Sequence, residues 1–93
     1  MTALEQEVYE KIVANMDVDT SELQGFDENS PLFGEGTPER PSMNLDSIDS
    51  LELTILIEKE WGLGEIARED MVKMLTVKAI ADYIEAQRKD GGK

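Results

Sequence analysis

The sequence predicts an all-α fold: a small four-helix antiparallel bundle, with three main helices, a short third helix and a long loop between helices 1 and 2. Apolar residues recur at helical spacing in separate segments, and no segment alternates apolar and polar residues as a strand does. All three prolines lie between the first two helical segments. The chain has 93 residues, so we expect a single domain, residues 1–93.

The first helix is expected to start directly after Thr2. Thr2 and Glu5 have the spacing of a capping box, in which each side chain accepts a hydrogen bond from the backbone N–H of the other residue. Its apolar stripe consists of Leu4, Val8, Ile12 and Met16. The stripe stops at residue 16, and we expect the helix to end there.

Residues 17–45 are predicted to form the long loop, which is unusually long for a compact domain. Such a loop needs apolar anchors, for which the candidates are Leu23, Phe26, Leu32 and Phe33. Residues 30–33 are predicted to form a short helical turn. Residues 34–44 offer few anchors, so we expect them to be the most mobile internal segment.

The second helix is predicted over residues 47–61. Asp46 suits its N-cap, and Asp49 places negative charge in the first turn, where the helix dipole favours it. Only one of its two apolar lines is able to face the core, which leaves the other partly exposed as a docking face unless the helix is buried on two sides. The lines are Leu53, Ile57 and Trp61, and Ile48, Leu51 and Ile55.

Two further helices complete the predicted bundle. Gly62 and Gly64 end the second helix, and a short third helix is expected over residues 66–75. The last helix is expected to use Thr76 as its N-cap. Its apolar stripe consists of Val77, Ile80, Ala81 and Ile84. Residues 88–93 are expected to form a frayed tail.

The net charge of −12 narrows the classes of partner. Nucleic acids and anionic membranes need basic faces, so we expect neither, and we expect proteins with basic docking patches instead. No apolar run is long enough to span a bilayer, which predicts a cytoplasmic protein without stable membrane insertion. The chain has no cysteine and no histidine, so no metal site is expected from those ligands.

Ser47 stands where the loop becomes the second helix, between Asp46 and Ile48. Because no histidine is available as a general base, Ser47 is not expected to be a catalytic nucleophile, and the chain is not expected to be an enzyme. Nothing places Lys59 or Lys73 beside it in a dry pocket, as a Ser-Lys dyad requires. A serine displayed at a helix start is suited instead to modification by another enzyme.

Three stretches of the sequence resemble the acyl carrier proteins, over about residues 4–86. The first stretch is residues 45–53 followed by residues 57–62: its Asp46-Ser47-Ile48 is similar to the Asp-Ser-Leu core of the family's attachment site, and residues 57–62 are similar to the acidic, aromatic end of the family's second helix. Residues 76–84 are similar to the family's last helix, and residues 30–36 to the end of the long loop in some stand-alone members. The resemblance implies that the whole chain is one acyl-carrier domain.

By this resemblance Ser47 carries 4′-phosphopantetheine, added covalently from coenzyme A by a magnesium-dependent phosphopantetheinyl transferase. The thiol of this arm would hold acyl groups as thioesters. A monomeric carrier would then deliver them to acyl-ACP synthetases, ketosynthases and acyltransferases of fatty acid, other lipid or polyketide-like pathways. Ser50 lies in a second Asp-Ser-aliphatic tripeptide, Asp49-Ser50-Leu51, but choosing it moves Leu53 and Ile57 out of register with the family's second helix.

The resemblance also implies a docking face that partner enzymes contact. Its expected members are Asp46, Ile48, Asp49, Leu51, Glu52, Ile55 and Glu58. Two features depart from the family pattern: Lys59 stands where an acid is common, and residues 37–44 are an apparent insertion. These departures indicate a specialised carrier for a dedicated pathway, such as an unusual lipid, a lipopolysaccharide acyl chain or a polyketide-like product.

Other classes of function remain as alternatives. A calcium-binding protein would suit the acidity, but the loop starting at Asp17 has Glu22 where glycine is required. A non-covalent acidic helical adaptor would dock through the face of Ile48, Leu51 and Ile55. A peptidyl or aminoacyl carrier would use the same chemistry as an acyl carrier.

Overall fold

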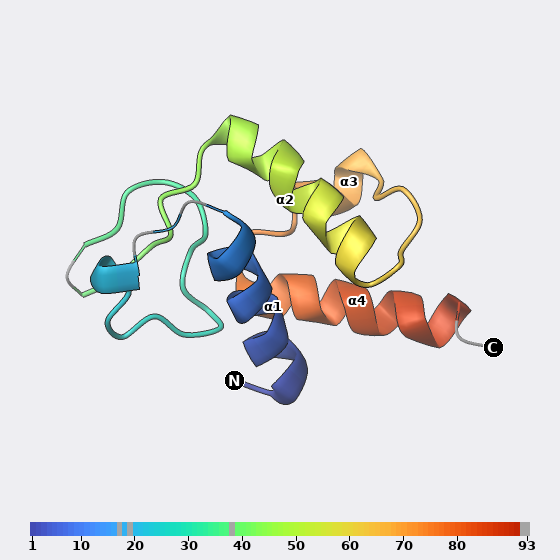
Figure 1. The fold of residues 1–93 in the computed structure, drawn as a ribbon, viewed down its shortest axis with the longest axis horizontal. Helices are drawn as coiled ribbons and strands as arrows, with labels where there is room; N and C mark the ends of the chain where they lie inside the picture. The colour runs from blue at the N-terminus through green and yellow to red at the C-terminus, as the bar shows by residue number, and fades with distance from the viewer. Residues whose placement is uncertain (17, 19, 38, 92–93) are drawn as a thin grey trace.

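The computed structural model of the chain describes residues 1–16, 18, 20–37 and 39–91. Over these residues it is all-helical, which confirms the predicted fold class (Figure 1). The elements are α1 (Ala3–Asn15), the short 3-10 helix η1 (Thr20–Glu22), α2 (Ser47–Glu60), α3 (Arg68–Met71) and α4 (Val77–Gly91). Asp17 and Asp19 of the calcium interpretation, Pro38 of the insertion and residues 92–93 of the tail lie outside the described residues.

Helix α1 is the element on which the other long helices meet. It packs against both α4 and α2, and Lys11 of α1 forms an ion pair with Glu60 of α2, with Nζ and Oε1 3.0 Å apart. In Figure 1, α2 and α4 both run from left to right, so these two helices are not antiparallel as we expected. The segment carrying α3 runs back along the molecule before α4 begins, which lets α2 and α4 share a direction.

The start of α1 is the predicted capping box. Thr2 Oγ1 accepts a hydrogen bond from Glu5 N–H at 3.1 Å, and Glu5 Oε1 accepts one from Thr2 N–H at 2.7 Å. The apolar stripes predicted for the long helices meet in one core, with the long loop contributing as well. The largest fully buried side chains are Ile12, Leu32, Ile57, Ile66, Ile80, Ile84, Val8 and Val77.

All four predicted loop anchors contact this core. Leu23 and Leu32 are buried, and Phe26 and Phe33 are half-buried against the core. The ring of Phe26 also lies against the ring of Tyr9 in α1, with centroids 5.6 Å apart. Burying these side chains removes apolar surface from water at roughly 25 cal/mol per Å², which offsets part of the cost of ordering so long a loop.

The predicted helical turn at residues 30–33 is wrong, because this stretch is extended and pairs with distant segments. Leu32 N–H donates to the carbonyl oxygen of Leu75, and Leu32 O accepts from Leu45 N–H, each at 3.0 Å. A helical turn would have directed these groups to near neighbours in sequence. Two isolated bridges accompany them, between Pro31 and Thr76 and between Phe33 and Leu45.

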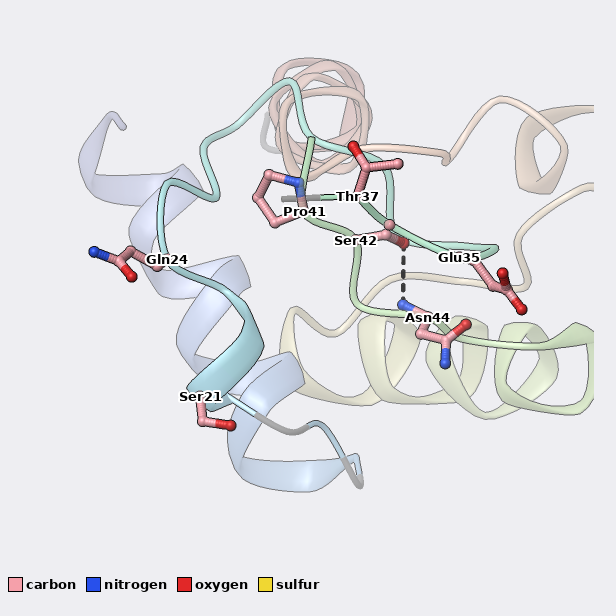
Figure 2. Close-up of a pocket in the computed structure, with 8 residues that line it drawn as sticks. Ser21, Gln24, Glu35, Thr37, Pro41, Ser42 and Asn44 are labelled. Atoms are coloured by element: carbon pink, nitrogen blue, oxygen red, sulfur yellow. Dashed lines mark hydrogen bonds between the residues drawn. The ribbon is translucent and has the colours of Figure 1, made fainter. Parts of the chain in front are cut away.

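Residues 34–44 have more anchors than we expected. Pro41, Ser42 and Met43 are all buried. The Ser42 hydroxyl donates to Gly34 O at 2.8 Å and accepts from Asn44 N–H at 3.0 Å, as the dashed line in Figure 2 marks. We missed Ser42 because its side chain is polar, and Pro41 because we counted it only as a loop residue. The expected mobility of the segment stays a prediction.

The third helix is shorter than the predicted 66–75. Only Arg68–Met71 are helical, and the N-cap Ala67 has no side chain able to accept a hydrogen bond. Ile66 is buried outside the helix, and its N–H donates to a Glu58 carboxylate oxygen at 2.8 Å.

Helix α4 starts as predicted, with Thr76 Oγ1 accepting from Ala79 N–H at 3.0 Å. Its end differs from the prediction: residues 88–91, expected to fray, belong to the helix. A cationic side chain such as Arg88 near a helix C-terminus is favoured by the helix dipole. Within the described ranges, every helix is too short or too polar for a transbilayer segment.

Gly36 is required by a close backbone contact, which leads to a prediction about stability. A Cβ atom at Gly36 would lie 2.5 Å from the backbone nitrogen of Ser42. We expect Gly36→Ala to lower the free energy of unfolding by about 1–3 kcal/mol, because the backbone of residues 40–42 has to move. Urea unfolding followed by circular dichroism measures this change.

Gly64→Ala is the matched control. A Cβ atom there meets no atom within 4 Å, and its backbone is not in the positive-φ region that Gly25, Gly34 and Gly62 occupy. We expect Gly64→Ala to leave stability unchanged or to raise it by up to about 1 kcal/mol. Equal effects of the two substitutions would contradict the close contact.

Candidate functional site

The chain enters α2 along a fixed path. Asn44 has a positive φ of 57°, a conformation that asparagine tolerates better than most residues. Leu45, the next residue, is 5% exposed and anchors the strand-like segment to Leu32. The helix therefore begins two residues after a buried, hydrogen-bonded anchor, which fixes the position of its first turn.

Asp46 and Asp49 form a second capping box, at the start of α2. Asp46 Oδ1 accepts from Asp49 N–H at 2.9 Å, and Asp49 Oδ2 accepts from Asp46 N–H at 3.0 Å. The backbone N–H of Asp49 is the main cause that holds the pKa of Asp46 below its ordinary value of 3.8. Each carboxylate thus uses one oxygen in the cap.

Ser47, the first residue of α2, is exposed. Its hydroxyl has no hydrogen-bond partner in the part of the chain that the structure describes, whereas its carbonyl oxygen accepts from the Ser50 hydroxyl at 2.7 Å. Ser50 is half-buried, so the rival serine is both less accessible and already hydrogen-bonded. The structure therefore presents the hydroxyl of Ser47 to solvent and engages that of Ser50.

The two apolar lines of α2 have opposite environments. Leu53 is 2% exposed and Ile57 is fully buried. On the other line Ile48 is 68%, Leu51 61% and Ile55 62% exposed. The interpretation of α2 as a helix buried on two sides is wrong, and the predicted outward apolar face exists. We refer to Ile48, Leu51 and Ile55 as the outer face of α2.

The acidic residues predicted to dock partners are not equivalent. Glu52 is exposed and beside the outer face. Glu58 is half-buried, and its carboxylate accepts the N–H of Ile66. Asp46 and Asp49 are partly committed to the cap. Of the four, Glu52 alone makes no hydrogen bond or ion pair within the described chain, and Glu58 holds the segment that follows α2.

Two further apolar side chains are exposed that we did not assign to a surface. Val72 is 63% and Leu75 54% exposed, in the segment after α3. The sequence predicted a continuous helix over residues 66–75 and assigned neither side chain to an exposed surface. Since the helix ends at Met71, the side chains beyond it follow the turns of an irregular segment, in which Met74 is buried and its neighbours are not.

An open hollow of about 620 Å³ lies on the loop side of the molecule. Ser21 and Gln24 line one side of it, and residues from the stretches 35–37 and 41–44 line the other (Figure 2). Gln24 and Asn44, which line it, point in different directions rather than toward a common centre. We assign no ligand to this hollow. Among the described residues no group of three potential metal-ligating side chains comes together either.

No protein-family model matches this chain, and no solved structure matches it. Function is therefore inferred from the residues at the start of α2.

The orientation of α2 leads to a prediction that compares two leucines of one helix. Leu53→Ala removes a buried side chain and should cost about 2–5 kcal/mol of stability. Leu51→Ala removes a side chain that is 61% exposed, and should change stability by no more than about 0.5 kcal/mol. Chemical denaturation of both variants tests this; a similar loss for both would mean that the outer face is buried.

The depressed pKa of Asp46 leads to a prediction about acid stability. A carboxylate whose folded-state pKa is lowered stabilises the fold above its ordinary pKa of 3.8, and this contribution is lost as the pH falls through the lower, folded-state value. Asp46→Asn keeps a good N-cap but does not titrate.

We therefore expect the wild type to lose stability relative to Asp46→Asn as the pH falls below 3.8. Urea unfolding of both proteins between about pH 2 and pH 6 measures the difference. Parallel curves over the whole range would contradict a stabilising, ionised Asp46.

Proposed function

We propose that this chain is an acyl carrier protein, in which Ser47 receives 4′-phosphopantetheine and the thiol of that arm holds acyl groups as thioesters. The observation that carries the proposal is the Ser47 hydroxyl: exposed, without a hydrogen-bond partner in the described chain, and placed at the first position of α2. The chain has no histidine to act as a general base, so we propose that Ser47 is the substrate of modification and that a separate enzyme supplies the catalytic base.

The proposed modification is a phosphoryl-group transfer from coenzyme A. The Ser47 oxygen attacks the phosphorus that bears pantetheine, and the new P–O bond forms as the pyrophosphate P–O bond breaks. Adenosine 3′,5′-bisphosphate leaves, and the serine proton passes to a base of the transferase. The chain contains no cysteine, so the thiol that carries the acyl group arrives with this group.

The start of α2 fits a phosphodiester at Ser47. The first N–H groups of a helix lack intrahelical acceptors and the helix dipole favours an anion there. The free oxygens of Asp46 and Asp49 oppose the phosphate at short range, which favours an arm that extends outward from the protein. A flexible arm then raises the local concentration of the acyl group at a docked enzyme.

The outer face of α2 supports the docking role. Ile48, Leu51 and Ile55 form an exposed apolar strip next to Ser47, with the Glu52 carboxylate beside it. A partner that covers this strip gains apolar burial, and a basic rim on that partner pairs with Glu52 and with the overall charge of −12. The proposed partners are the transferase and acyl-handling enzymes with such surfaces.

The same apolar strip favours a second candidate function. Exposure of three large aliphatic side chains on one helix face also suits a non-covalent acidic adaptor that docks by this face alone. The two candidates differ in one respect: only the carrier needs the Ser47 hydroxyl. Within the carrier proposal, Lys59 and the insertion at residues 37–44 favour a dedicated pathway over general fatty acid synthesis.

Modification by a transferase is the direct test. Incubation with coenzyme A, magnesium and a broad-specificity phosphopantetheinyl transferase should add the mass of one phosphopantetheine to the intact protein. Ser47→Ala should abolish the gain, because the acceptor oxygen is missing. Ser50→Ala should retain it, since that hydroxyl only bonds to the Ser47 carbonyl.

The controls separate the possible results. A gain that persists in Ser47→Ala and is lost in Ser50→Ala would move the attachment site by one turn. No gain in a folded wild-type protein, with an unrelated carrier modified in the same mixture, would favour the adaptor.

A further inference from the structure

The insertion before α2, residues 37–44, contains one basic side chain in an otherwise acidic stretch of the sequence. Arg40 is the only lysine or arginine between Lys11 and Lys59. Its side chain is exposed and forms no ion pair within the residues described. A cation that has no structural partner, in a segment this acidic, is available to an external group.

Arg40 is held in a defined place. Thr37 N–H donates to Arg40 O at 2.9 Å, and Arg40 N–H donates to Thr37 O at 3.1 Å and to Thr37 Oγ1 at 3.0 Å. The buried residues 41–43 follow directly, and Gly36 packs against the backbone of Ser42. The turn that carries Arg40 is therefore joined directly to residues that are buried in the protein.

The turn lies on the same side of the molecule as the start of α2. In Figure 1 the loop before α2 lies on the left, on the side where α2 begins, and the C-terminal end of α4 is on the right. Only four residues, 41–44, separate Arg40 from the Leu45 anchor. A typical protein interface covers about 800 Å² on each partner, so an enzyme docked on Ser47 and the outer face has the size to meet this turn as well.

We propose that Arg40 is a specificity-determining residue for docking, a step that rests on the proposed carrier function. It disfavours partner enzymes whose contact surface is basic throughout, and it fits enzymes that place an acidic side chain opposite this turn. A like charge at the rim of an interface slows association, and an opposite charge speeds it, in a salt-dependent manner.

The test uses the transfer reaction itself, with coenzyme A and a broad-specificity phosphopantetheinyl transferase whose docking surface is basic. Arg40→Glu should raise kcat/KM several-fold at low salt, mostly through KM, and the gain should shrink as salt is added. The side chain of Arg40 makes no intramolecular ion pair in the described chain, so the fold should tolerate the change.

Arg88→Glu is the matched control. Arg88 is also exposed and lies in the last part of α4, away from Ser47. The two variants have the same net charge, so net charge alone predicts equal gains, whereas the proposal predicts a gain for Arg40→Glu only. Equal rates for wild type and Arg40→Glu, or equal gains for both variants, would overturn it.

A second measurement tests the other part of the proposal, that an acidic side chain of the partner enzyme suits the position opposite Arg40. Single Lys→Glu or Arg→Glu variants across the basic surface of the transferase should include one that modifies wild type faster and Arg40→Glu slower. Absence of any such coupled pair would overturn the assignment of an acidic counterpart. Failure of the carrier proposal is distinguishable, because then neither wild type nor any variant would gain mass.

Discussion

The backbone of Leu32 is the constraint on which the arrangement of this protein depends. Its N–H and carbonyl groups reach the segments before α4 and before α2, at Leu75 and Leu45, while its side chain is fully buried. Each such hydrogen bond contributes only about 0.5–1.5 kcal/mol. Their importance is geometric: one residue in the middle of the long loop ties together the starts of two helices that are far apart in sequence.

The proposed modification site follows from that constraint rather than from a constellation of catalytic side chains. Leu45 ends the anchored segment, the Asp46–Asp49 box starts the helix, and Leu53 and Ile57 hold its inner face in the core. Ser47 and the outer face of α2 remain exposed to solvent. A helix fastened at its start and along one side presents the opposite side in a fixed orientation, which suits recognition by other proteins.

Helical periodicity and capping chemistry made much of this fold predictable. Thr2, Asp46 and Thr76 were all identifiable as caps because their side chains act within three residues. The exposed and buried lines of α2 followed from spacing. Leu56, which is also buried, belongs to the same helical pattern as Leu53 at three residues' distance, but we assigned it to neither line.

The predictions that were wrong concern segments whose structure depends on contacts with distant parts of the sequence. Residues 30–33 are extended because Leu45 and Leu75 supply hydrogen-bond partners for the backbone of Leu32. The residues near Leu32 in sequence do not indicate these partners. Burial of Ser42 depends on the carbonyl of Gly34 and the approach of Gly36. The short α3 begins after Ile66, whose N–H donates to Glu58, and ends before Leu75, whose carbonyl accepts from Leu32. For the same reason the role of Glu58 differs from its expected one.

The outer face of α2 also has a consequence for how copies of this protein behave toward each other. Bare aliphatic surface tends to self-associate, yet every molecule carries a net charge of −12 that repels its neighbours over a Debye length of roughly 10 Å at moderate ionic strength. Charge repulsion thus keeps molecules apart although each exposes an apolar helix face. Near 1 M salt, where this range shrinks to about 3 Å, the repulsion no longer shields the strip.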